Sequence, residues 1–458
     1  MNRWEALDKQ YVWHPFTQQK GWTEAEQLVI DHGEGVKLVD TEGRAYYDGI
    51  SSLWVNMHGH RHPKIDAAIR RQLDSIAHST MLGLINKPAS ELAERLVNLA
   101  PKGLTKVFYS DDGSTAVEVA LKMAFQYWQH KQRTRKQKFL TLSSAYHGDT
   151  IGSVSVGGID LFHRVFKPLL FETEHLPCPS CFHCRLTEDK AHCPMLCVDA
   201  LERVLAEHHE EIAGVIVEPL IQAAAGMLMQ PEGYLRRVRE LTKQYNVLLI
   251  ADEVAVGFGR TGTMFACEHE GVTPDFMALS KGISAGYLPL AATLTTQEVY
   301  DAFLGEPEEA KTFYHGHSYT GNPLACAAAL ANLEVFAEEK VLAGLEDKIA
   351  LIDQYRRRLA QHPAVGDARQ RGMIMALELM ADKQTQTPFP VEKLMGAGVC
   401  HAAREYGLII RNIGDVVIFM PPLASTTTEL AEMLEAMEKA LQAVCAGETV
   451  CISDGCAF

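Results

Sequence analysis

The chain of 458 residues is long enough for two or three units with their own cores, because one such unit takes about 150 residues. Its net charge of −15 argues against a nucleic-acid partner, since that binding requires a basic face. No signal peptide begins the sequence and no apolar run has the length of a membrane span, so we expect a cytoplasmic protein that does not bind membranes.

The first 60 residues contain a predicted hairpin. Strand-like residues 35–40 and 45–48 flank the turn Thr41-Glu-Gly-Arg44. The stretch 330–458 also mixes helical patterns with short strands. We therefore predict one smaller α+β domain that is assembled from residues 1–60 and 330–458.

The middle of the chain, residues 61–329, has the pattern of a larger α/β domain. Short apolar runs alternate there with helical patterns, which is typical of a mainly parallel sheet covered by helices. The predicted strands are 106–109, 139–142, 214–217, 247–251, 276–279 and 291–294. Ligands bind beyond the carboxyl ends of strands in such sheets, so the polar residues at those ends are candidates for a site.

Two of these strand ends carry groups suited to a phosphorylated, aromatic ligand. Gly113 and Ser114 open a predicted helix, whose first turn presents N–H groups and a hydroxyl at its positive end, as a phosphate requires. Ser114 as an ordinary N-cap is an equally good interpretation. Tyr146 follows the next strand and could stack on a flat ring, although ordinary packing is the usual role of a single tyrosine.

An insertion at about residues 175–197 concentrates five of the eleven cysteines. Their spacing is compatible with tetrahedral zinc, and we expect a structural metal there. Free or redox-sensitive thiols are the alternative. Three more cysteines lie near the end of the chain, and no disulfide framework is expected. The candidate metal ligands are Cys178, Cys181, Cys184, Cys193 and Cys197; the terminal cysteines are Cys445, Cys451 and Cys456.

An aspartate and a lysine, Asp252 and Lys281, follow the predicted strands 247–251 and 276–279. A lysine in an apolar pocket has a lowered pKa and can form a Schiff base with an aldehyde. A carboxylate beside a pyridine nitrogen keeps that ring protonated, which makes it an electron sink. The pair therefore suits pyridoxal phosphate (PLP). Residues 257–262 match G-x-G-x-x-G but open no helix, so we interpret them as a tight loop and not as a dinucleotide site.

At this point the sequence resembles the fold-type I, class III aminotransferases over nearly its whole length. The resemblance is carried by Leu249-Ile-Ala-Asp252-Glu, Gly257-Phe-Gly-Arg260-Thr-Gly, Ser280-Lys281-Gly and His315-Gly-His-Ser-Tyr-Thr-Gly-Asn322. Within this class, the chain is most similar to the branch that converts 8-amino-7-oxononanoate to 7,8-diaminononanoate in biotin biosynthesis. The marks of that branch are Trp13-His-Pro-Phe-Thr17, Asp48-Gly-Ile-Ser-Ser-Leu-Trp54 and Tyr146-His-Gly-Asp149.

The resemblance implies a homodimer with shared active sites and assigns roles to particular residues. Lys281 would hold PLP and move the proton, with Asp252 at the ring nitrogen, Tyr146 on the ring, and Gly113 and Ser114 at the phosphate. The implied phosphate contacts from the partner subunit are Gly316, His317 and Ser318. The implied substrate contacts are Phe16, Trp54, Tyr146, Asp149, Arg260, Gly316, Lys281 and Arg411, the last at the substrate carboxylate.

Several residues depart from the family pattern, and they bear on the amino donor. S-adenosylmethionine is the usual donor of the branch, whereas Phe16 and the pair His317-Ser318 are similar to members that use lysine. Two other functions stay open at this point. One is transamination of another ω-amino acid or diamine; the other is a metal-dependent binding module whose aminotransferase body is inactive.

Overall fold

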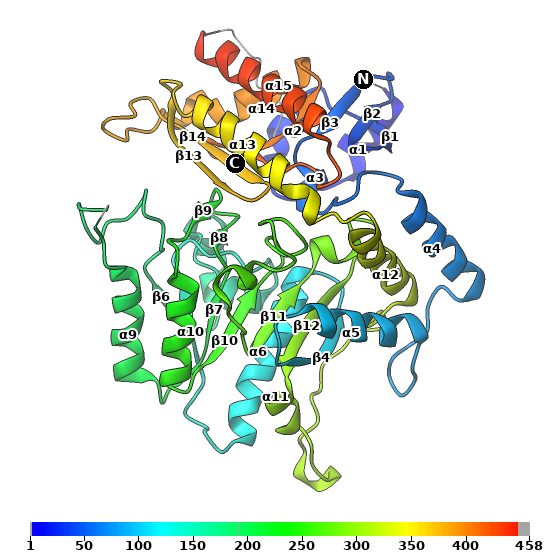
Figure 1. Cartoon of the computed structure of the whole chain (residues 1–458), viewed down its shortest axis with the longest axis vertical. Coiled ribbons are helices and arrows are strands. Elements are labelled where there is room, and N and C mark those ends of the chain that lie inside the picture. The colour runs from blue at the N-terminus through cyan, green and yellow to red at the C-terminus, as the bar shows by residue number, and fades with distance from the viewer. Residues whose placement is uncertain (1, 191, 448–458) are drawn as a thin grey trace. The chain divides into compact units, whose positions relative to one another are not determined.

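The computed structural model describes residues 2–190 and 192–447, which form two compact units (Figure 1). The small unit combines the residues up to His62 with those from Ala343 onward, and the large unit runs from Pro63 to Leu342. The second boundary follows Leu342 and not residue 329, because helix α12 (Pro323–Glu338) packs on α4 and α5 of the large unit. Cys451 and Cys456 lie outside the described residues.

A seven-stranded sheet in the described part of the chain forms the centre of the large unit. Its order is β4-β12-β11-β10-β7-β5-β6, and β12 is antiparallel to both of its neighbours while the other pairs are parallel. The mainly parallel sheet predicted from the sequence is therefore confirmed. The strands are β4 (Leu104–Ser110), β5 (Lys138–Leu142), β6 (Thr173–Leu176), β7 (Ile212–Val217), β10 (Leu248–Asp252), β11 (Phe276–Leu279) and β12 (Ala291–Thr296).

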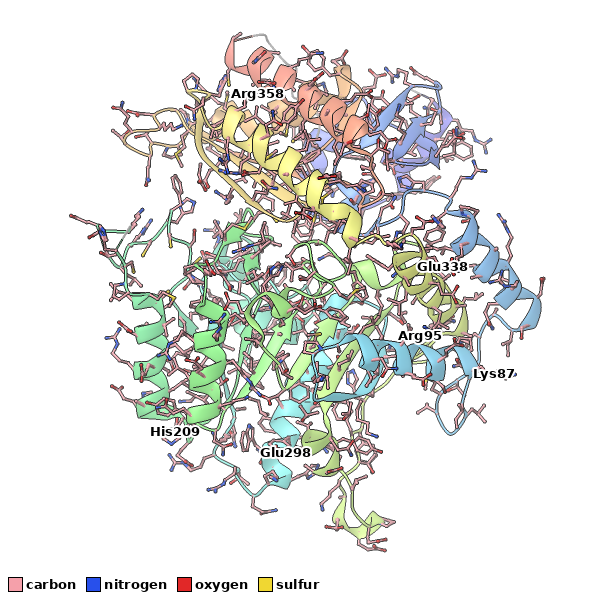
Figure 2. All side chains as sticks on the ribbon, viewed as in Figure 1. Lys87, Arg95, His209, Glu298, Glu338 and Arg358 are labelled. Carbon is pink, nitrogen blue, oxygen red and sulfur yellow. The ribbon has the colours of Figure 1, made fainter. Side chains whose placement is uncertain are left out.

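The central strands are continuous apolar runs because both of their faces are covered. Every residue of β7, β10 and β11 is buried, and α6 (Gly113–His130) packs on β7, β10, β11 and β12. A tyrosine of α6, Tyr127, donates a hydrogen bond over 2.9 Å to Glu298, which is labelled in Figure 2. The other helices of this unit are α4 (Pro63–Ser75), α5 (Lys87–Leu99), α7 (Ile151–Ser155), α8 (Asp160–His163), α9 (Leu196–His208), α10 (Tyr234–Gln244) and α11 (Gln297–Asp301).

The small unit contains two four-stranded sheets among its described residues, in the orders β1-β2-β3-β15 and β13-β14-β17-β16. The first sheet joins the two ends of the chain, because β15 pairs with β3. Arg358 of α13, labelled in Figure 2, forms an ion pair with Glu438 of α15. The strands are β1 (Ile30–Glu34), β2 (Lys37–Asp40), β3 (Ala45–Asp48), β13 (Val365–Arg371), β14 (Ile374–Leu379), β15 (Leu408–Ile409), β16 (Arg411–Ile413) and β17 (Val416–Phe419); the helices include α1 (Arg3–Tyr11), α2 (Gln19–Glu24), α13 (Glu346–Leu359), α14 (Met395–Glu405) and α15 (Thr427–Cys445).

None of the helices in the described residues is both long enough and apolar enough to cross a membrane.

Candidate functional site

Asp252 and Lys281 leave neighbouring strands at the same edge of the large sheet. In the parallel register of β10 and β11, Asp252 lies opposite Ala278, and Lys281 follows three residues later. Lys281 has a φ of 45°, an uncommon left-handed backbone conformation for a residue with a side chain. Strain of this kind clusters at functional sites, because surrounding packing must hold it. The two residues that the sequence singled out therefore belong to one site.

The Lys281 ammonium is buried within a group of ionisable side chains. Burial lowers the pKa of Lys281, because the charged form loses its hydration; the nearby Arg260 guanidinium acts in the same direction. The carboxylates of Asp252 and Glu218 oppose this shift. A lowered pKa gives the neutral amine that can attack a carbonyl carbon.

Asp252 is held by two hydrogen bonds. One carboxylate oxygen lies 2.7 Å from Nδ1 of His147, and the other accepts the backbone N–H of Val254 at 3.0 Å. Nε2 of the buried His147 has no hydrogen-bond partner among the described residues. The sequence assigned no role to His147, although it stands beside Tyr146 at a strand end.

Glu218 is a second member of the site that the sequence did not single out. It follows β7, and its carboxylate accepts the backbone N–H groups of Tyr146 at 3.1 Å and Ala223 at 2.8 Å. Burial raises the pKa of Glu218 to about 7. The sequence could have identified Glu218 by its place directly after a buried strand, which is the criterion that identified Asp252.

The predicted phosphate site is the first turn of α6, and its phosphate contacts stay a prediction. Asp112 is the N-cap, since its carboxylate accepts the N–H of Thr115 at 2.9 Å, so the N-cap interpretation of Ser114 is wrong. The Ser114 hydroxyl instead accepts the N–H of Asp149 at 3.1 Å. A Cβ atom on Gly113 would lie 2.6 Å from a methyl group of Val254, so only glycine fits there.

Tyr146 is half-buried beside this turn. Its hydroxyl donates a hydrogen bond to Asp149 over 2.7 Å, and its ring meets the edge of Phe162 with the centroids 6.3 Å apart. Burial, followed by the Asp149 hydrogen bond, raises the pKa of Tyr146. The phenol therefore stays protonated and oriented at neutral pH.

The segment with Gly316, His317 and Ser318 approaches the same turn within the single chain. Nδ1 of His317 lies 3.4 Å from the carboxylate of Asp111, two residues before Gly113. Gly316 and Ser318 are exposed. The contacts across a subunit interface that the resemblance implied for these three residues stay a prediction.

Three predicted substrate residues, Phe16, Trp54 and Arg411, belong to the small unit. Trp54 is buried and ends a turn in which Ser51, Ser52, Leu53 and Trp54 all have positive φ, between 48° and 70°. Consecutive left-handed residues with side chains are rare and strained. Asp48 stabilises the turn by accepting the N–H of Ser52 at 2.8 Å.

Arg411 lines a cavity of about 170 Å³ in the small unit, together with Ile50 and Leu53. No ion pair joins its guanidinium to a carboxylate among the described residues. An arginine with an apolar wall and no acidic partner is suited to an external carboxylate. Phe16, also in this unit, is exposed and has a φ of 47°.

The cysteine insertion has no preformed metal site. Among the residues that the structure describes, no three His, Cys, Asp or Glu side chains are already arranged as metal ligands, so the expected structural zinc is not supported. Burial raises the pKa of Cys178 and of Cys197 to about 11, which argues against reactive thiolates. The thiols nevertheless line one small cavity.

Known proteins are similar to this chain over almost its full length. Residues 19–441 match the family model described as aminotransferase class-III. The adenosylmethionine-8-amino-7-oxononanoate aminotransferase of Geobacter sulfurreducens is 53% identical, covering 96% of this chain and 97% of the relative. The protein of that name from Aquifex aeolicus is 52% identical, covering 96% and 97%.

Solved structures agree with these relatives. The crystal structure of adenosylmethionine-8-amino-7-oxononanoate aminotransferase from Methanocaldococcus jannaschii superposes with a TM-score of 0.91 and 44% identity, covering 96% of this chain and 98% of that one. An omega transaminase from Pseudomonas jessenii in complex with PMP has a TM-score of 0.93 and 31% identity, covering 98% and 100%.

The geometry fits a PLP-type cofactor. A buried amine with a lowered pKa, a carboxylate held by a histidine, and a helix N-terminus with a glycine and a serine are the groups that the aldehyde, ring nitrogen and phosphate require.

Proposed function

Because the chain belongs to the class III aminotransferases, which use PLP, we propose that it transfers an amino group to 8-amino-7-oxononanoate, a step of biotin biosynthesis. Relatives with this activity in their names are about half identical over the full chain. The observation that carries the proposal is the buried Lys281 amine at the strand end beside Asp252 and His147.

Each residue of the cradle has a defined task in this reaction. PLP supplies an electron sink when it is bound. Asp252, oriented by His147, would place a negative charge at the ring nitrogen. Gly113 and Ser114 would hold the phosphate at the positive end of α6. The neutral Lys281 amine would remove the proton from the Cα atom of the donor in the first half-reaction, and its ammonium form would supply a proton to the acceptor carbon in the second.

We assign recognition of the acceptor's carboxylate to Arg411. The absence of an acidic partner and the apolar neighbours Ile50 and Leu53 support this assignment, since the acceptor has a long alkyl chain that ends in a carboxylate. Arg411→Ala is expected to raise the KM for 8-amino-7-oxononanoate about 30-fold, equivalent to a loss of about 2 kcal/mol. Arg411→Lys is the matched control, because it keeps the charge without the planar fork.

S-adenosylmethionine is the proposed donor, since the relatives' names specify it. The experiment is an end-point assay with purified holoenzyme, 8-amino-7-oxononanoate, and either S-adenosylmethionine or lysine, with 7,8-diaminononanoate detected by mass spectrometry. Product with S-adenosylmethionine alone supports the proposal. Product with lysine alone would assign the donor that Phe16 and His317-Ser318 indicated.

A broader amine specificity is the second candidate function, because an omega transaminase is 31% identical and superposes closely. The same assay decides between them when ω-amino acids and diamines replace the donor. Higher kcat/KM with those donors than with S-adenosylmethionine, and no diamine product from 8-amino-7-oxononanoate, would favour this candidate.

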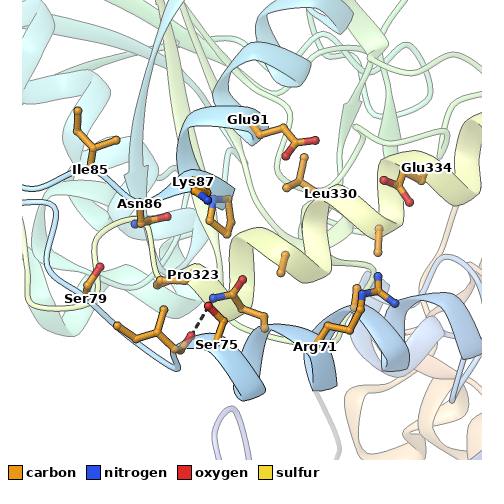
Figure 3. A pocket seen from close by; sticks show the side chains of 16 residues that line it. Arg71, Ser75, Ser79, Ile85, Asn86, Lys87, Glu91, Pro323, Leu330 and Glu334 are labelled. Atoms are coloured by element: carbon orange, nitrogen blue, oxygen red, sulfur yellow. Dashed lines mark hydrogen bonds between the residues drawn. The ribbon is translucent and has the colours of Figure 1, made fainter.

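We also propose a homodimer. The supporting surface is an open groove of about 540 Å³ between α4, α5 and α12, where Ile85 is 86% exposed (Figure 3). Its rim carries both signs of charge, so two copies related by a two-fold axis can pair them. Asn86 links the groove to the segment after His317 by donating to the Gly321 carbonyl at 3.0 Å. The charged rim residues are Arg71, Lys87, Glu91 and Glu334.

Light scattering after gel filtration tests the dimer. Wild-type protein is expected at twice the chain mass, and Ile85→Asp is expected to shift it toward the monomer because a charge would be buried at the interface. Leu161→Asp is the control, since Leu161 is 69% exposed on a different helix, α8. A wild-type monomer that is fully active would contradict the proposal.

A further inference from the structure

Glu218 joins two segments that leave neighbouring strands of the large sheet. It directly follows β7, and its side chain is buried. One carboxylate oxygen accepts the backbone N–H of Tyr146 at 3.1 Å, and the other accepts the N–H of Ala223 at 2.8 Å. Tyr146 stands 72 positions earlier, in the segment after β5, the strand beside β7. The carboxylate is therefore a bridge between the segments 143–149 and 219–230.

The segment 219–230 is tied back to the end of β7. The Gln230 amide group donates a hydrogen bond to the Glu218 carbonyl at 2.7 Å, and the side-chain oxygen of Gln230 accepts the N–H of Leu220 at 3.0 Å. The backbone on both sides of the Glu218 carboxylate is thus held at the edge of the sheet. The two short strands of this segment are β8 (Ile221–Gln222) and β9 (Leu228–Met229).

The bond to Glu218 is the long-range one among three contacts of Tyr146. The Tyr146 hydroxyl bonds to Asp149, which is only three residues further along the same segment, and the ring meets Phe162 of α8. The Asp149 contact sets the rotation of the phenol ring, but Asp149 moves with the segment. The bond from the Tyr146 N–H to Glu218 reaches a strand end of the central sheet, so it fixes the place of the whole segment there.

A carboxylate is the group that this bridge requires. An ionised Glu offers one acceptor oxygen to each of two N–H groups and has no donor of its own. The two N–H groups favour this ionised form, against the burial that raises the pKa of Glu218. An amide of the same shape has only one acceptor oxygen, and its NH₂ group would face the second N–H. Ala223 is 1% exposed, so water cannot replace an acceptor that its N–H loses.

We propose that Glu218 is a positioning residue for the cofactor. By fixing the Tyr146 segment at the edge of the sheet, Glu218 holds the tyrosine ring where it stacks on the ring of PLP. The assignment rests on the proposed function, with Tyr146 on the cofactor. Glu218 acts through Tyr146 and is assigned no contact with the cofactor or the substrate.

Glu253 provides a matched comparison, because it makes the same kind of bridge elsewhere. It is fully buried, and its two carboxylate oxygens accept the N–H groups of Cys267 at 2.7 Å and Ala266 at 2.9 Å. Those two residues begin a short 3-10 helix outside the Tyr146 segment. Replacement by Gln removes the same acceptor at either glutamate, but only the change at Glu218 releases the N–H of Tyr146.

The test is a double-mutant cycle on the affinity for PLP. The full-length protein is freed of cofactor and titrated with PLP, and binding is followed by the visible band of the lysine-bound cofactor. Glu218→Gln is expected to raise the Kd about tenfold when Tyr146 is present, because the ring is no longer held in place. In the Tyr146→Ala background the same change is expected to raise the Kd less than about twofold, since the ring through which Glu218 acts has been removed.

Glu253→Gln is the control, and it is expected to change the Kd by the same factor in both backgrounds. Equal factors for Glu218→Gln in both backgrounds would overturn the proposal and leave Glu218 with a structural role alone. Because the cycle is read from cofactor binding, it gives this answer even if 8-amino-7-oxononanoate proves to be the wrong acceptor.

Hydrogen exchange on the wild-type chain covers the case in which Glu218→Gln fails to fold. The segment 219–226 is assigned no contact with PLP, yet it is joined to Tyr146 through Glu218. Addition of PLP to the apoprotein is expected to slow amide exchange in 143–149 and in 219–226 together, by at least about fivefold in each. Exchange in 219–226 that is unchanged by PLP would overturn the bridge.

Discussion

Lys281 and Lys136 are lysines of the large unit whose amines are both withdrawn from solvent, yet their surroundings differ. Nζ of Lys136 donates to the carbonyls of His209, Ile212 and Asn246 at 2.5, 3.2 and 2.9 Å, and burial lowers its pKa to about 8. Burial also lowers the pKa of Lys281, which lies among Asp252, Glu218 and Arg260 at the ends of strands.

The difference shows that burial by itself does not make a lysine reactive. The Lys136 ammonium has its three donors used by three carbonyls and lies 4.7 Å from the centroid of the Trp128 ring, so it ties three loops together. Lys281 instead faces groups that a cofactor and substrate need, at the sheet edge where ligands bind. Substitutions at the two lysines and their neighbours can break or sharpen this distinction.

The largest effect is expected at Lys281. Lys281→Ala removes both the amine that holds the cofactor and the group that moves the proton, so kcat should fall by at least ~10⁴-fold. Circular dichroism and the melting temperature should stay close to wild type. Turnover within tenfold of wild type, read in the diamine assay, would mean that another lysine carries the reaction.

The next effect is expected at the Asp252–His147 pair. Asp252→Asn removes the charge at the ring nitrogen, and single-turnover rates with the amino donor should fall by roughly 10³-fold, equivalent to about 4 kcal/mol. Asp275→Asn is the control: Asp275 precedes β11 and pairs with Arg239 at 2.7 Å, so it should lower stability and leave the rate nearly unchanged. Equal rate losses in both variants would assign Asp252 a structural role.

Lys136→Met should separate stability from chemistry. The three carbonyls lose their shared donor, so the free energy of unfolding should fall by about 3 kcal/mol, measured by urea denaturation. The kcat should stay within about twofold, because the side chain contacts no cofactor group. Lys138→Met removes an exposed neighbour that pairs with Glu211, and it should leave the free energy of unfolding nearly unchanged. A large loss of kcat in Lys136→Met would break the distinction between the two lysines.

The smallest effect concerns the pH dependence of stability that Glu218 causes. Its folded pKa of about 7 lies above the ordinary value of 4.5, so the folded chain keeps a proton that the unfolded chain has lost. The stabilisation of the folded state that this proton provides is complete below pH 4.5 and is lost as the pH rises through 7. In the wild-type apoprotein, the free energy of unfolding should decline by about 2 kcal/mol between about pH 5 and 7 because of Glu218, and Glu218→Gln should remove this decline. Glu253, with a similarly raised pKa, contributes a slope of the same sign that remains in the variant. If the free energy of unfolding has the same pH slope in the wild type and in Glu218→Gln, Glu218 is ionised in the folded state.

Local sequence patterns were sufficient for the strands and for two central residues of the site. A fully buried parallel strand requires an unbroken apolar run, so β7, β10 and β11 were visible in the sequence, and so were Asp252 and Lys281 directly after two of them. The same criterion, a place at a strand end, identified Gly113, Ser114 and Tyr146, and the family motifs assigned their roles. Strand β6 was missed because Thr173–Leu176 has only four residues, of which Leu176 alone is apolar, so neither an apolar run nor an alternation marks it.

Tertiary structure decided which distant groups meet. His147 and Asp252 are separated by 105 positions, and they bond only because β5, β7 and β10 are neighbours in one sheet. Asp112 caps α6 and Ser114 does not, which depends on backbone angles at the turn. Helix α12 belongs to the large unit because it packs on α4 and α5. These two helices lie more than two hundred residues earlier in the chain, so no local pattern shows the contact.

The sequence by itself determined the strands that end in Asp252 and Lys281, the family and the spacing of the cysteines, since each depends on residues within one motif. The tertiary structure decided that Glu218 and His147 complete the cradle, that Lys136 is sequestered by three carbonyls, and that Cys178 bonds to Gln222 apart from the other four thiols. The physical reason is that burial and hydrogen-bond partners are properties of the packed sheet and its loops, which no short stretch of sequence contains.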